Sequence, residues 1–202
     1  MLKQIVVLLA FVAFAAHGFP GGKIKCGSSI SSKTFTLSNP SNPPNDCVYK
    51  VKSYSSKVCQ LRLDIEMVLA APTVSNVQSG RNNTKCVDDF LEIGEYKFCG
   101  REPNQHIYIP FSEKTTEIRV FSSSRSGGSL LPRVSWNIRV KQLECPKGLS
   151  ASSVLPYSDF DLLAPAGCLQ YFQEKTGLIS SFNLDSGRGS YTSGLSYAIC
   201  LK

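Results

Sequence analysis

The sequence predicts an all-β protein, built as a two-sheet antiparallel β-sandwich, and three observations favour this fold class. Apolar and polar residues alternate strictly along several segments, which places one face of each segment on a core and the other in water. Stretches rich in Pro, Asn, Ser and Gly interrupt these segments at short intervals. No segment shows a helical period, and alternation alone leaves a β-barrel as the alternative architecture.

The N-terminal residues 1–18 are expected to be a secretory signal peptide, followed by a short lead over 19–25. Lys3 supplies the positive charge, and the apolar run 5–16 is too short to cross a bilayer of roughly 30 Å. Small residues place the cleavage after Gly18; a membrane anchor or a buried strand is the alternative. Because no later stretch is long and apolar enough to span a membrane, we expect a secreted, extracellular protein.

The alternation is clearest over residues 60–67, 117–120 and 134–141, which are expected to be strands half-buried on a core. Six shorter strands are expected over residues 35–37, 47–51, 90–93, 107–109, 168–172 and 178–182. Turn-rich stretches over residues 38–45, 77–85 and 122–129 separate them.

The stretch 146–167 contains Pro, Ser and Gly but no alternation, and this predicts a linker. It would separate a complete domain over residues 26–145 from a tail over residues 168–202. The tail has too few residues to bury an independent core without a cross-link. Eight cysteines in a secreted chain supply such cross-links, because an oxidising compartment favours four disulfides.

Four cysteines stand in sequence contexts that resemble one known family. These contexts are Cys26-Gly27, Asn45-Asp46-Cys47-Val48-Tyr49, Cys86-Val87-Asp88-Asp89-Phe90-Leu91-Glu92-Ile93 and Phe98-Cys99-Gly100. With Ile118–Ser123 and Trp136, they are similar to a CUB domain over residues 26–145. The segments Cys59–Asp64 and Gly167–Phe172 resemble a secreted arthropod variety of CUB protein, some members of which occur in venom or haemolymph.

The resemblance implies a CUB-type, jelly-roll-like sandwich in which Cys26 bonds to Cys47 and Cys86 bonds to Cys99. Cys59 and Cys145 depart from the common family pattern, and two free thiols are the alternative to a bond between them. Such a bond would close a loop of about 87 residues and stabilise the fold by roughly 4 kcal/mol. The fourth expected pair, by elimination, is Cys168–Cys200.

The tail repeats features of the head of the chain. Cys168, the segment 177–183 and Tyr197–Cys200 resemble Cys26, the segment 34–39 and Cys47–Tyr49. We therefore expect a partial second CUB-like unit, either as a natural end or as part of a longer chain. A truncated sandwich exposes a sheet edge, so the tail is expected to pack against the first domain.

Enzymatic activity is not expected. Nucleophilic catalysis needs a nucleophile, a base and an orienting group. After the signal peptide the chain has one histidine, His106, which is expected to be solvated or structural. The sequence contains no Gly-x-Ser-x-Gly elbow and no phosphate-binding loop motif, and we expect no cofactor.

A tight calcium site is not expected either. The resemblance implies three acidic side chains near the loops at one end, and Asp89 stands at the position of one of them. The other two positions fall in 69–71 and 122–125, which carry no acid, and Arg125 adds a positive charge there. Asp89 is thus expected to be a lone remnant of a family calcium site.

The chain is basic, with a net charge of +7. Basic residues recur on the polar faces of the expected strands, at Lys50, Lys52, Arg62, Arg119, Arg139 and Lys141. Singly they are solvated; if the strands are neighbours, they would form a basic stripe for anionic glycans or lipid head groups. No nucleic acid partner is expected, because exposed aromatic residues are not interleaved with them. Asn82 lies in the sequon Asn82-Asn83-Thr84 and is expected to be glycosylated.

The function expected from the resemblance is that of a secreted, non-enzymatic recognition module, with a venom role open. Its partner would be an extracellular protein or an anionic glycan, bound by end loops such as 69–85 and 122–132. One alternative is the regulatory N-terminal part of a CUB-containing serine protease. Another is a cationic toxic or antimicrobial protein. The sequence indicates neither an oligomeric state nor the identity of the target.

Overall fold

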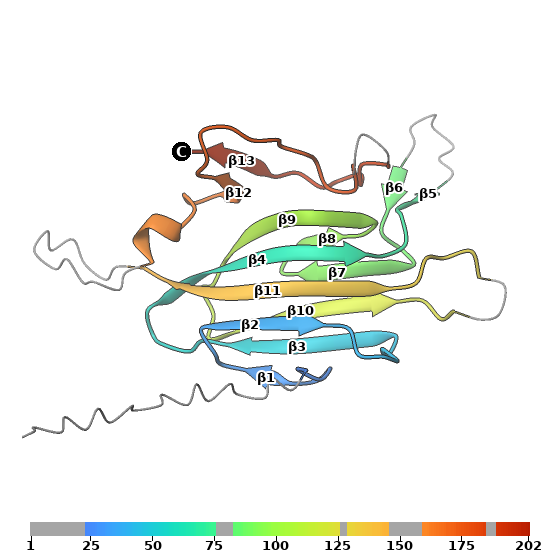
Figure 1. Cartoon of the computed structure of the whole chain (residues 1–202), viewed down its shortest axis with the longest axis horizontal. Coiled ribbons are helices and arrows are strands. Elements are labelled where there is room, and N and C mark those ends of the chain that lie inside the picture. Colours follow the sequence, from blue (N-terminus) through green and yellow to red (C-terminus); the bar gives the residue numbers. More distant parts are fainter. Residues whose placement is uncertain (1–22, 76–82, 126–128, 146–158, 185–188) are drawn as a thin grey trace, which may run out of the picture.

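The computed structural model of the chain describes residues 23–75, 83–125, 129–145, 159–184 and 189–202. The expected signal peptide, most of the expected linker and Asn82 lie outside these ranges. Apart from one short 3-10 helix, the regular structure in these ranges is β (Figure 1). This confirms the predicted fold class.

The first sheet has five strands in the order β1, β3, β10, β7, β8. Their bounds are Ser29–Ile30, Asp46–Lys52, Thr115–Ser122, Asp89–Ile93 and Tyr96–Phe98. Strands β1 and β3 run parallel, and the other neighbours are antiparallel. The apolar members of the central strands alternate with polar ones, so one face of this sheet is buried.

The second sheet has four antiparallel strands in the order β2, β11, β4, β9. Their bounds are Thr34–Ser38, Ser135–Glu144, Val58–Val68 and Arg101–Pro110. A short antiparallel pair, β5 (Thr73–Ser75) and β6 (Asn83–Lys85), forms a separate ribbon. Figure 1 shows the long strands of both sheets running along the longest axis of the molecule.

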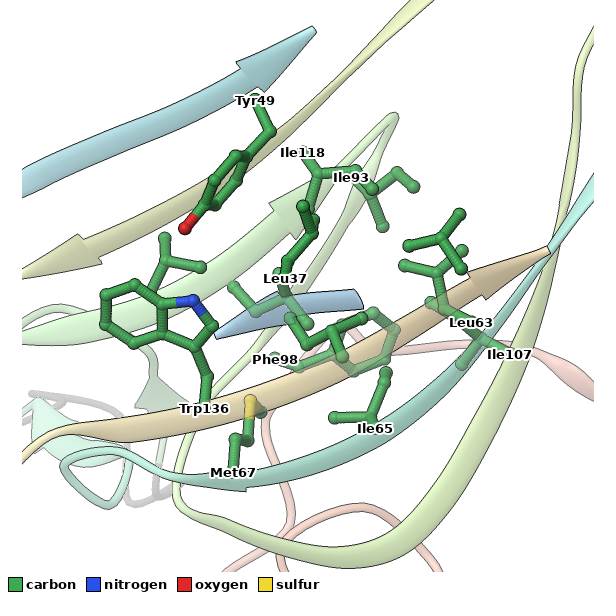
Figure 2. Packing of buried hydrophobic residues seen from close by; sticks show 14 of the residues in the cluster. Leu37, Tyr49, Leu63, Ile65, Met67, Ile93, Phe98, Ile107, Ile118 and Trp136 are labelled. Atoms are coloured by element: carbon green, nitrogen blue, oxygen red, sulfur yellow. The ribbon is translucent and has the colours of Figure 1, made fainter. Parts of the chain in front are cut away.

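The core lies between the two sheets. Leu63, Ile65 and Ile138 point inward from the four-stranded sheet, and Tyr49 and Ile118 from the five-stranded sheet, each with at most 2% of its surface exposed. Figure 2 shows Tyr49 and Trp136 approaching each other from opposite layers. The hydrophobic face of each sheet is removed from water, which is the main force that holds a sandwich together.

The expected strands are present, except for the segment 178–182, which is not a strand. Leu178 is 89% exposed, whereas Phe182 is buried against Phe98, with the ring centroids 4.6 Å apart. The next residue, Asn183, has a φ of 56°, which turns the chain out of an extended path. Packing of one aromatic ring thus overrides the local β propensity of this segment.

Four disulfides cross-link the described residues, and no cysteine there is free. They join Cys26 to Cys47, Cys59 to Cys145, Cys86 to Cys99 and Cys168 to Cys200, the pairs expected above. The bond between Cys59 and Cys145 ties the start of β4 to the residue that follows β11, with Cα atoms 5.7 Å apart.

From here on, the tail means the described residues 159–184 and 189–202, which pack on the sandwich. They contain the 3-10 helix η1 (Phe160–Leu162) and the parallel strand pair β12 (Cys168–Phe172) and β13 (Ala198–Leu201). Strand β12 lies beside β9, the edge strand of the four-stranded sheet, and Leu169 and Phe182 are part of the main core. The tail therefore covers a sheet edge, and its parallel disulfide-linked pair has the same kind of pairing as β1 and β3.

Candidate functional site

Asp89, the expected remnant of a calcium site, is the first residue of β7 and is 1% exposed. Its carboxylate accepts two backbone hydrogen bonds, from Ala70 N at 2.7 Å and from Ser123 N at 3.1 Å. The guanidinium of Arg125 binds both oxygens, with Nη1 3.0 Å from Oδ1 and Nη2 2.5 Å from Oδ2. Arg125 itself is held by the carbonyl groups of Ser123 and Pro132.

This arrangement places a protein cation where a metal would have to bind. Both carboxylate oxygens of Asp89 already accept two hydrogen bonds each. Calcium needs about six to eight oxygen ligands, and no group of three or more His, Cys, Asp or Glu side chains that could hold a metal occurs among the residues described. Asp89 and Arg125 form an internal ion pair that joins the start of β7 to the loop after β10, and the Asp89 carboxylate also holds Ala70 in the loop after β4.

Calcium is not expected to stabilise the protein. Addition of about 1 mM CaCl₂ should leave the melting temperature of the full chain unchanged, because Arg125 already pairs with Asp89, the one acidic side chain expected at a calcium-binding position of the family. Differential scanning calorimetry with and without EDTA measures this. A rise of several degrees with calcium would contradict the assignment of Asp89 to an internal ion pair.

His106 lies on β9 and faces the tail. Its Nε2 is 3.0 Å from the carbonyl oxygen of Tyr171 and 3.3 Å from the amide nitrogen of the same residue. The ring also packs edge-on against Phe172, with centroids 4.7 Å apart. Burial, followed by the positive charge of Arg62, lowers the pKa of His106 below its usual value of 6.5. The contacts show a structural histidine at the junction of the sandwich and the tail.

The second prediction follows from this lowered pKa. The unfolded chain binds the proton more readily than the folded protein, so the folded state is fully favoured above about pH 6.5 and loses stability as the pH falls below it. The variant His106→Gln lacks the titrating group and is expected to show a flatter decrease. Urea unfolding curves at a series of pH values compare the two proteins. Parallel decreases in unfolding free energy would contradict the prediction.

The six basic residues of the predicted stripe do not form one surface. Lys50, Lys52 and Arg119 lie on the five-stranded sheet, whereas Arg62, Arg139 and Lys141 lie on the four-stranded sheet. Since each points away from the core, the two groups face opposite sides of the sandwich. The expectation of one basic stripe is therefore wrong: the six residues form two groups of three, on opposite outer faces of the sandwich.

The outer face of the five-stranded sheet is electrically compensated. Arg119 binds the carboxylate of Asp46 through Nε at 2.8 Å and Nη2 at 2.9 Å, and its Nη1 lies 3.4 Å from Glu92. Lys50 lies 3.6 Å from Glu117. The basic residues of this face are largely neutralised by neighbours on adjacent strands.

The outer face of the four-stranded sheet is only partly compensated: Arg62 pairs with Asp64, and Lys141 Nζ lies 4.0 Å from Asp159 Oδ1. Its central strand β11, with the residue pair before it, presents one outward row, here called the β11 row: Arg133, Ser135, Asn137, Arg139 and Lys141. The intervening side chains, such as Trp136 and Ile138, point into the core. The row contains three basic residues and no acid. Arg133 was not predicted as a site residue, although extending the alternation of 134–141 by one residue would have placed it on this face.

Two depressions lie along this face. The larger, of about 550 Å³, lies at the Arg133 end, and Lys23, Arg101 and Asn39 contribute to its walls. The smaller, of about 300 Å³, is lined by Arg139, Arg62 and Thr36. Glu66 and Asn137 line both depressions, so the two adjoin. Together they form a groove along the β11 row, with both polar and apolar residues in its walls.

The expected binding loops are partly covered by the tail. Leu69 and Ala70, at the start of the loop 69–85, are buried, and Thr84 on β6 exchanges hydrogen bonds with Ser193. In the loop 122–132, Ser123 and Arg125 hold Asp89. These residues are thus engaged within the chain, whereas Val74 and Leu130 of the same loops are exposed to solvent.

Comparison with known protein families finds one match, and this match lies in the tail. The family described as "Animal CUB domain" matches residues 165–202, the region expected to be a second CUB-like unit. No curated protein matches the chain. Among 18 matching chains of solved structures is "CUB1-EGF-CUB2 domains of rat MASP-1", with 9% identity and a TM-score of 0.41. That match covers 74% of this chain, which spans about half (51%) of the solved chain.

The described residues contain no helix that is long and apolar enough to cross a membrane.

Proposed function

We propose that the protein is a secreted, non-enzymatic recognition module of the CUB type, whose partner is an extracellular protein or an anionic glycan. The observation that carries this proposal is the contrast between the two outer faces of one cross-linked sandwich. On one face Lys50 and Arg119 are paired with acids. On the other face Arg62 and Lys141 have acidic partners, but among the described residues Arg133 and Arg139 of the β11 row have none and line an open groove. A rigid scaffold that presents two unpaired arginines on one face is suited to binding.

The similarity of residues 165–202 to animal CUB domains supports an extracellular binding role. The proposal includes cleavage after Gly18, a first CUB unit over 26–145, a linker over 146–167, a partial second unit over 168–202 and a glycan on Asn82. Occurrence in arthropod venom or haemolymph rests on the sequence resemblance alone.

The experiment uses the full chain, secreted from insect cells with its disulfides intact. The labelled protein is added to immobilised extracellular matrix, and unlabelled protein is the competitor. We expect saturable, competable binding that is lost after reduction and alkylation, because the binding face depends on the cross-linked fold. Binding that does not saturate, or that survives reduction, would contradict the proposed function.

A further inference from the structure

The β11 row is a linear array of positive charge. Arg133 and Arg139 lie six residues apart on one face of a strand, which corresponds to about 20 Å at roughly 3.4 Å per residue. Lys141 extends the row by a further step of about 7 Å. Such a spacing suits an elongated ligand better than a compact one.

The two arginines of the row are not neutralised within the part of the chain that the structure describes. Asp64 lies opposite Arg139 in the sheet register, but it forms an ion pair with Arg62, with Nη2 of Arg62 2.8 Å from Oδ1 of Asp64. Neither Arg133 nor Arg139 forms a side-chain hydrogen bond or ion pair there. Two solvated guanidinium groups in one row can bind anionic groups through charge-assisted hydrogen bonds.

The surroundings of the row supply hydrogen-bonding groups, next to an apolar part of the larger depression that includes Met67, Val68 and Pro103. Strand β2 adds the hydroxyl groups of Thr36 and Ser38 on one side, in register with Arg139 and Asn137. Asn137 and Glu66, which face each other across β11 and β4, stand between the two depressions. Hydroxyls, an amide and a carboxylate can together donate and accept hydrogen bonds with a hydroxyl-rich ligand.

On these grounds, which rest on the proposed function, we propose that the β11 row binds a linear acidic polysaccharide. The chain lies along β11, with its sulfate or carboxylate groups on Arg133 and Arg139 and its hydroxyls on Asn137 and the β2 side chains.

Other anionic macromolecules fit this face less well. Single-stranded nucleic acid needs exposed aromatic rings for stacking, and the aromatic residue nearest the row, Trp136, is 3% exposed. A membrane surface favours apolar residues next to the basic ones. Leu130, which lies three residues before Arg133 and is fully exposed, does not line the groove, and neither do Leu178 and Leu201 of the tail.

The test compares two charge variants of the full chain. Arg133→Gln/Arg139→Gln removes two positive charges from the β11 row. The matched control, Lys52→Gln/Lys114→Gln, removes two exposed charges at the end of β3 and just before β10, which belong to the five-stranded sheet. All four side chains are exposed, so both variants are expected to keep the wild-type melting temperature.

Affinity for heparin and for hyaluronan is measured by calorimetry in about 0.15 M salt, where long-range charge effects are screened. We expect the wild type and the control to bind equally and the arginine variant to bind about tenfold more weakly. Binding of heparin alone assigns the contact to sulfate groups, and binding of both probes assigns it to carboxylates as well.

Absence of binding to both probes, or an equal loss in the two variants, would overturn the inference. The inference would also be overturned if the wild type bound phosphatidylserine vesicles more tightly than either polysaccharide and the arginine variant lost this vesicle binding. If the chain binds extracellular matrix saturably and the arginine variant binds it as tightly, this inference fails while the proposed function stands.

Discussion

Replacing Arg125 with alanine is expected to lower the free energy of unfolding by about 3–5 kcal/mol. The side chain of Asp89 has no exposed surface and would keep its two backbone hydrogen bonds but lose the guanidinium that pairs with it. An unpaired buried carboxylate is much less stable than a paired one, because the protein interior cannot replace the lost hydration. Chemical denaturation of the full chain measures the change.

Two further variants separate the charge pair from simple loss of packing. The double variant Asp89→Ala/Arg125→Ala removes the buried charge together with its partner, so it is expected to be less destabilised than the sum of the single changes. Arg125→Lys keeps the charge but loses the two-pronged contact, and should be intermediate. Additive effects in the double variant would show that the two side chains do not stabilise each other.

Replacing Cys59 and Cys145 together with alanine is expected to lower the free energy of unfolding by about 4–5 kcal/mol. The bond joins residues separated by 86 positions, so its loss restores much conformational freedom to the unfolded chain. In the folded state Cys59 lies at the start of β4 and Cys145 directly follows β11, and these are the central strands of the sheet that carries the β11 row. Thermal and urea unfolding provide the measurement.

The natural comparison is the pair Cys86–Cys99, which closes a loop with a separation of only 13 positions. Its replacement by alanine is expected to cost about 3 kcal/mol on the same relation. If the short loop proves the more stabilising of the two, loop entropy is not the main contribution of the Cys59–Cys145 bond.

The sheets were predictable because their cause is local. The alternation in β4 and β11 directly reports which side chains face the core, and the structure places Leu63 and Ile138 there. The four disulfide pairs depended on the family resemblance, since spacing alone leaves many pairings open. The prediction of a strand over residues 178–182 was wrong, because a tertiary contact between Phe182 and Phe98 decides the path of this segment.

The candidate site was predictable only in part. The sequence placed Asp89 and Arg125 in the same region. The two residues are 36 positions apart, and the contact between them depends on how the loop after β10 folds back onto the start of β7. Whether a basic residue is neutralised depends on strand register: Arg119 meets Asp46 across β10 and β3, 73 positions away. Among the described residues Arg139 forms no ion pair, since Asp64, which lies opposite it, is paired with Arg62. Register and pairing are non-local, so the sequence alone could not divide the basic residues into two faces.

The most direct test of a binding face on the four-stranded sheet is a map of the bound ligand. The isotope-labelled full chain is titrated with a heparin oligosaccharide, and NMR shifts of the backbone amides and arginine Nε groups are followed. We predict that the largest changes lie along residues 133–141 and at Thr36, with β3 and β10 unaffected. Changes concentrated on β3 and β10, or spread evenly over all basic residues, would contradict it.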